Sequence, residues 1–154
     1  MCTSSLDLLT GTLHRPSNYW LSYLSAGHPE TPLCVLADLA HSADHTIRMR
    51  VAENKLTPVF IQRMLVNDSH PDVRSALAEN PAVSEEILWK LAKDEDPIVR
   101  YELADNPRVA LTVLVTLVND ENPYVSVRAE QTMEKILGAT RPAQKSKKAQ
   151  MLAA

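Results

Sequence analysis

The sequence predicts an all-α protein: a right-handed α-solenoid of about four 26-residue two-helix repeats, with an N-terminal cap helix. Three observations predict this fold. The 154-residue chain repeats itself with a period of 26, its apolar residues recur at helical spacing within each period, and only 3 glycines are present, which disfavours a turn-rich β fold. Helices this short are marginal alone, so each repeat must bury its apolar face against a neighbour.

Proline marks the period. Eight of the ten prolines fall into three registers of 26 residues, which are Pro71, Pro97 and Pro123; Pro29, Pro81 and Pro107; and Pro32 and Pro58. The repeats then cover residues 33–58, 59–84, 85–110 and 111–136. The domain boundaries that follow are residues 1–32 for the N-terminal cap region, 33–138 for the four-repeat solenoid and 139–154 for a disordered basic tail.

The first element is a cap helix over residues 17–24, "SNYWLSYL", which holds three of the seven aromatic residues. A solenoid needs such a cap because its terminal repeat would otherwise expose core. Trp20 therefore has two interpretations. It either packs on the first repeat or anchors a partner, since aromatic residues are typical binding hot spots.

Each repeat begins with a short helix. This helix starts after Thr31-Pro32, Thr57-Pro58, Ser84 or Ala110. Threonine or serine can cap its free N–H groups, and proline is favoured at the first helical position. Apolar pairs four residues apart share one helix face in every repeat, namely Val35/Leu39, Ile61/Leu65, Ile87/Leu91 and Val113/Leu117.

The second helix of each repeat starts at Pro71, Pro97 or Pro123, or after Asp44 in the same register. Aspartate and asparagine before these starts are good N-caps; they are Asp44, Asp96 and Asn122. The buried stripe, as in Val99, Leu103 and Ala104, has the spacing of one helix face. Asn54, Asn80 and Asn106 mark the end of this helix, the last two in an Asn-Pro step, and in the last repeat Gly138 is the expected stop.

Composition and charge exclude several classes of function. A net charge of −3 disfavours nucleic acid as a partner. The two cysteines lack the spacing of a metal site or a disulfide framework, and no cofactor is expected. Without a signal peptide or an apolar run of about 20 residues, the expectation is a cytoplasmic protein with no membrane contact.

A row of arginines is the leading candidate site. Arg48, Arg74 and Arg100 share one register, and stacking would line up their guanidinium groups for an acidic peptide or a phosphate backbone. The alternative is structural, because aspartates with the same period could pair with these arginines between repeats; they are Asp68, Asp94 and Asp120. The row fails in the last repeat, where Ser126 takes the arginine slot.

Slots that change from repeat to repeat are the other candidates for partner contact. Arg63 and Trp89 occupy one such slot, shared with Ala37 and Val115. Tyr101 occupies another, shared by residues of quite different size; they are Met49, Ser75 and Val127. A slot that tolerates such variety is expected to be at least partly exposed, although local packing is the competing explanation.

A metal site or a catalytic site has little support in the sequence. His41, His45 and His70 could lie near one another, but a metal site needs at least three convergent ligands, and no metal site is predicted. The carboxylates around residues 94–105 are explained by capping and solvation rather than by general acid–base work. No nucleophile triad, phosphate loop or dinucleotide fingerprint occurs, so no catalytic residue is assigned.

The segments "LAKDEDPIVRYELADNP", "LVNDSHPDVRSALAENP" and "LVNDENPYVSVRAE" resemble the leucine-rich repeat variant family, a HEAT-like α-solenoid group seen in bacteria. The resemblance covers roughly residues 28–136 and implies a curved stack of short helix pairs with a binding or scaffolding role. The period of 26 is slightly longer than the family's typical unit. No cysteine cluster suits an iron–sulfur centre, so none is carried over.

The leading hypothesis is a non-enzymatic protein-interaction or scaffolding module for a protein or peptide. The alternative is a nucleic-acid-binding HEAT-like domain, resembling alkylpurine glycosylase solenoids, with the arginine row on phosphates. A third possibility is an accessory subunit of an enzyme. The oligomeric state is left open by the sequence, as is the role of the basic tail, whose charges are Arg141, Lys145, Lys147 and Lys148.

Overall fold

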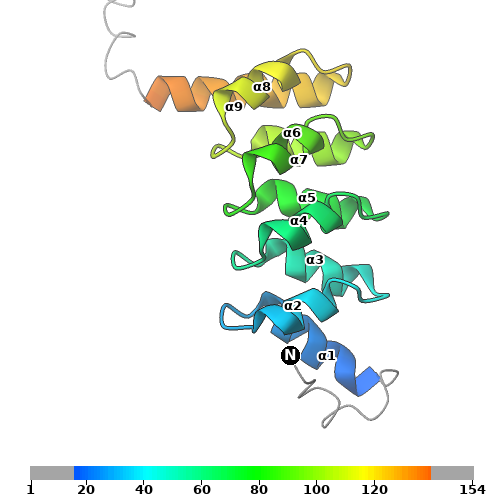
Figure 1. Cartoon of the computed structure of the whole chain (residues 1–154). Coiled ribbons are helices and arrows are strands. Elements are labelled where there is room, and N and C mark those ends of the chain that lie inside the picture. The colour runs from blue at the N-terminus through cyan, green and yellow to red at the C-terminus, as the bar shows by residue number, and fades with distance from the viewer. Residues whose placement is uncertain (1–15, 140–154) are drawn as a thin grey trace, which may run out of the picture.

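The protein is all-helical over residues 16–139, the part of the chain that the structure, a computed structural model, describes. These residues form nine α-helices and no strand, which confirms the predicted all-α class. Figure 1 shows the helices stacked in layers, from α1 at one end to α8 and α9 at the other. The predicted basic tail, apart from Ala139, lies outside the described residues, as does the start of the cap region.

Four short helices begin where the sequence predicts. They are α2 (Leu33–Leu39), α4 (Val59–Leu65), α6 (Glu85–Leu91) and α8 (Leu111–Val118). The predicted threonine and serine caps are wrong, because none of these helices has a side-chain N-cap hydrogen bond. Thr57 instead donates its hydroxyl proton to the Val51 carbonyl, which satisfies an acceptor at the end of the preceding helix. Pro32 and Pro58 are themselves the N-cap residues and not the first helical ones.

The longer helices form the other series, which comprises α1 (Pro16–Gly27), α3 (His45–Glu53), α5 (Pro71–Glu79), α7 (Pro97–Asp105) and α9 (Pro123–Ala139). The predicted aspartate caps are confirmed, since Asp44 accepts from the Thr46 N–H and Asp96 from the Ile98 N–H. Asn122 does the same for α9.

The two end helices are longer than predicted. Helix α1 runs from Pro16 to Gly27 rather than over residues 17–24, and α9 continues to Ala139. Gly138 therefore lies inside α9 and does not stop it. Glycine only weakens a helix interior by roughly 1 kcal/mol, so a helix that packing supports can run through it.

The core lies between the two series of helices. Each longer helix packs against the next longer one, from α1 to α3, α5, α7 and α9, and each short helix packs against the longer helix that follows it. The predicted apolar registers are buried, including Val51, Leu77, Leu103 and Ala129. Leu39 departs from its register because it is only partly buried, unlike Leu65, Leu91 and Leu117. Fully burying one such aliphatic side chain contributes about 1.5–3 kcal/mol.

None of the helices between residues 16 and 139 has the length and apolar character needed to cross a membrane.

Candidate functional site

The arginine row joins consecutive repeats. Arg74 extends from α5 to the next repeat, where its Nε lies 2.7 Å from Asp94 Oδ2 and its Nη2 lies 2.9 Å from Asp94 Oδ1. Its Nη1 donates to the Asp68 backbone carbonyl of its own repeat at 2.7 Å. The same bidentate pairs join Arg48 to Asp68 and Arg100 to Asp120. The predicted pairing of arginine with aspartate between repeats is therefore present three times.

Each aspartate of this arginine–aspartate ladder also accepts a backbone hydrogen bond. One carboxylate oxygen accepts a backbone N–H two residues further on, as Asp68 does from His70. Burial raises the pKa of the Asp68 carboxyl, but hydrogen bonds from Arg48 and the His70 N–H, together with the Arg48 charge, leave the pKa below its usual value. The pKa of Asp120 is lowered in the same way, with Arg100 overcoming the effect of burial. Asp68 and Asp120 are therefore stabilised in the ionised form that pairs with arginine.

The ladder ends in the last repeat as predicted. Ser126 takes the arginine slot and donates to the Val118 carbonyl at 2.7 Å. Arg128, two residues further on, points instead to α7, where its Nη1 lies 3.5 Å from Asp105 Oδ1.

Asparagines form a second ladder that the sequence pattern had marked only as helix ends. Asn80 donates from Nδ2 to the Ala52 and Asn54 carbonyls of the preceding repeat, at 2.6 and 3.1 Å, and accepts the Ala82 N–H. Asn54 donates in the same way to the Ala26 and His28 carbonyls, and Asn106 donates to the Ala78 carbonyl. The recurrence of Asn at one register in three of the four repeats was the signal that could have revealed it.

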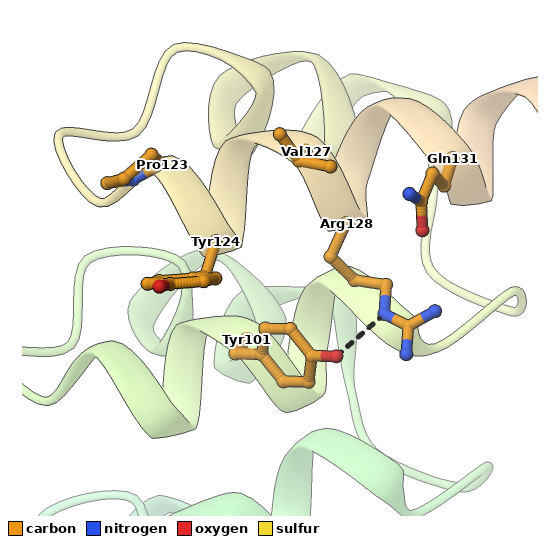
Figure 2. Close-up of a pocket in the computed structure, with 6 residues that line it drawn as sticks. All are labelled: Tyr101, Pro123, Tyr124, Val127, Arg128 and Gln131. Carbon is orange, nitrogen blue, oxygen red and sulfur yellow. Dashed lines mark hydrogen bonds between the residues drawn. The ribbon is translucent and has the colours of Figure 1, made fainter.

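A groove lies between α7 and α9. Its volume is about 540 Å³, and its lining comprises Tyr101, Pro123, Tyr124, Val127, Arg128 and Gln131. Figure 2 shows Tyr124 and Arg128 pointing from α9 toward α7, where Tyr101 lies. Arg128 Nε donates to the Tyr101 hydroxyl at 3.0 Å, and its Cζ is 5.2 Å from the ring centroid. Tyr101 is thus held in place, whereas Tyr124 is 77% exposed.

The other predicted contact residues do not join this groove. Trp89 is partly buried against the core, and Arg63 makes an exposed ion pair with Glu86 at 2.7 Å. Trp20 is 65% exposed on α1, with its ring centroid 5.2 Å from that of Tyr19. Helix α1, which carries Trp20, is separated from α7, which carries Tyr101, by α3 and α5 (Figure 1).

Tyr124 and Ile98 are exposed residues that the comparison of repeats had not singled out. They share one register with Thr46 and Asp72. That slot changes from repeat to repeat as much as the slot of Tyr101 does, so the same comparison could have found them.

Four carboxylates on α3, α5 and α7 lie near one another. Burial raises the pKa of Glu79, and the nearby charges of Glu102, Glu53 and Asp105 raise it further. Nearby like charges disfavour the ionised form of a carboxyl group; two of these carboxylates also face arginines, Glu53 facing Arg50 and Asp105 facing Arg128.

Two histidines lie together, as the sequence had left possible. The rings of His45 and His70 stack with centroids 3.7 Å apart and planes 12° from parallel. The third metal-ligating group beside them is Asp72, and His41 is not part of the cluster.

No protein-family model, curated protein or solved structure matches the chain.

Proposed function

We propose that the protein is a non-enzymatic interaction module, a small α-solenoid of four two-helix repeats similar to the leucine-rich repeat variant and HEAT groups. Its stacked helices and its two inter-repeat ladders support a rigid scaffold whose joints repeat along the chain. A scaffold of this kind acts by presenting a surface to another protein or a peptide.

The observation that carries the proposal is the groove between α7 and α9. It combines an exposed tyrosine, a second tyrosine held by an arginine, and an apolar wall that includes Val127. Tyrosine and arginine are the residues that most often dominate binding energy at protein interfaces. Because Arg128 already fixes the Tyr101 ring, a partner would lose little side-chain entropy at that residue on binding.

The nucleic-acid alternative lacks a comparable observation. Nε and both terminal nitrogens of Arg74 and Arg100 are engaged by aspartate and backbone oxygens. Contact with a phosphate backbone would require these bonds to break. The net charge of −3 adds no attraction for a polyanion. We therefore propose only protein or peptide binding.

The test places a photo-crosslinking amino acid at position 127 of the full-length protein in cells and identifies what is captured. A specific partner is expected, and Tyr124→Ala should weaken its affinity by about 30-fold or more, the range of a hot-spot residue. The matched control is Phe60→Ala, because Phe60 is an aromatic residue on α4 that is 58% exposed and lies outside the groove. Equal affinity in all three proteins would contradict the proposal.

A further inference from the structure

The stacked histidines lie where two adjacent repeats meet. His45 is the first residue of α3, and His70 is the N-cap residue of α5. Both rings are partly buried, and Asp72 in the first turn of α5 completes a cluster whose ligand atoms lie within 4.8 Å of one another. The cluster belongs neither to the arginine–aspartate ladder nor to the groove between α7 and α9.

Both histidines depart from the repeat pattern. The slot of His45 holds proline in the other three repeats, and the slot of His70 holds Asp44, Asp96 and Asn122. Proline is favoured at the first helical position, and aspartate or asparagine at the N-cap. At both positions a histidine therefore stands where the other repeats have a residue that favours the start of a helix, and the two histidines contact each other between α3 and α5.

The distances suit a metal ion. Tetrahedral zinc holds nitrogen and oxygen ligands at about 2.0–2.2 Å, which places neighbouring ligand atoms about 3.4 Å apart. His70 Nδ1 and Asp72 Oδ2 are 3.5 Å apart. These two atoms are thus already spaced as two ligands of one ion. The rings of His45 and His70 are stacked, so the His45 ring must turn out of that parallel arrangement before one of its nitrogens, which lie within 4.8 Å of the other ligand atoms, can become the third ligand.

The hydrogen bond that the ion would displace is weak. His70 Nδ1 accepts the Asp72 N–H at 3.3 Å, whereas the cap bonds of Asp44, Asp96 and Asn122 measure 2.9, 2.8 and 3.0 Å. The longest of the four cap bonds is the one at the histidine. Its Nδ1 lone pair is accordingly the most available for a stronger ligand.

We propose that His45, His70 and Asp72 bind one divalent transition-metal ion of the zinc class. Two imidazoles and one carboxylate are ligands that such ions prefer, and they leave a fourth position for water or a partner's side chain. The bound ion joins α3 to α5 and so ties the first repeat to the second.

The experiment uses the full chain without an affinity tag and measures Zn²⁺ affinity by competition with a chromogenic chelator. We expect one ion per chain, and an affinity at least about tenfold weaker in each of His45→Gln, His70→Asn and Asp72→Asn. Even residues that only orient a ligand typically change metal affinity by 10–100-fold. Asparagine at position 70 keeps a good N-cap, so loss of binding in that variant is not loss of the fold.

The control is His41→Gln, which removes a histidine outside the cluster and should leave the affinity within about twofold of the original. Co²⁺ provides a second readout, because tetrahedral coordination produces strong visible absorption bands that should be absent in His70→Asn. The proposal is overturned if the unaltered protein binds no Zn²⁺, or if His45→Gln and His70→Asn bind it as tightly as the unaltered protein.

Discussion

Replacing Asp94 with alanine should destabilise the protein far more than a surface substitution does. The change leaves the Arg74 guanidinium in a site where both side chains of the pair are only 8% exposed. Removing one partner of a buried ion pair costs about 3–5 kcal/mol, because the remaining charge is desolvated and uncompensated. Glu95 Oε1, 3.9 Å from Arg74 Nη2, offers partial compensation, which points to the lower end of that range.

A second loss adds to the first. Asp94 Oδ1 also accepts the Asp96 N–H at 2.9 Å, and an unsatisfied backbone donor costs about 1 kcal/mol or more. The expected total is about 4 kcal/mol, which corresponds to a fall in Tm of about 8–16 °C for a chain of this size. Urea unfolding followed by far-UV circular dichroism measures the free energy directly.

The exposed pair of Arg63 and Glu86 provides the matched control. It also joins successive repeats, at 2.7 Å, but its side chains are 59% and 66% exposed. Glu86→Ala should therefore cost only about 0–1 kcal/mol. If Asp94→Ala costs no more than Glu86→Ala, the arginine–aspartate ladder does not hold the repeats together as described.

Three further predictions concern stability. Asn80→Ala removes the donor to the Ala52 and Asn54 carbonyls and the acceptor for the Ala82 N–H, and should cost about 3 kcal/mol in urea unfolding; a cost below about 1 kcal/mol would show that the asparagine ladder is dispensable. Thr132→Val should leave stability unchanged or raise it by about 1 kcal/mol, because the buried Thr132 hydroxyl has no hydrogen-bond partner among residues 16–139; a clear loss would reveal a bond that the structure does not show. Acid should destabilise the protein through Asp68 and Asp120, whose pKa values in the folded state lie below the usual 3.8. Their contribution is present above about pH 4 and is lost as the pH falls from there through the folded-state pKa values, so a pH series of urea midpoints should be flatter in Asp120→Asn than in the original protein.

Much of the fold was predictable because the period of 26 allows residues at equivalent positions of the repeats to be compared. Residues that recur, such as Arg74 and Asp94, occupy the same environment in every repeat, so their pairing could be predicted from register alone. The threonine caps were predicted wrongly for a local reason. Thr57 lies between two helix ends, and nothing in its spacing decides whether its hydroxyl serves the helix before it or the one after.

The groove and the histidine cluster were harder to predict. Exposure of Tyr124 depends on what the neighbouring layer leaves uncovered, and only the three-dimensional stack shows that. Register predicted that His45 and His70 could meet, but not that Asp72 completes the cluster. That residue lies in a slot filled by threonine, isoleucine and tyrosine elsewhere, so no repeated pattern marked it.

The two ladders also imply that the free energy of local unfolding differs between the middle and the ends of the stack. The contact of α3 with α5 and the contact of α5 with α7 each include one arginine–aspartate pair and one asparagine side chain bonded to a carbonyl of the preceding repeat. Between α7 and α9 the only ladder contact is the Arg100–Asp120 pair, because Thr132 occupies the position of the ladder asparagines. Between α1 and α3 the only ladder contact is the asparagine side chain of Asn54. Amide hydrogens in the outer helices should therefore exchange faster than those in the middle. Because Tyr124 lies on α9, we expect the backbone beneath this surface to open more readily than that of α5 in the middle of the stack.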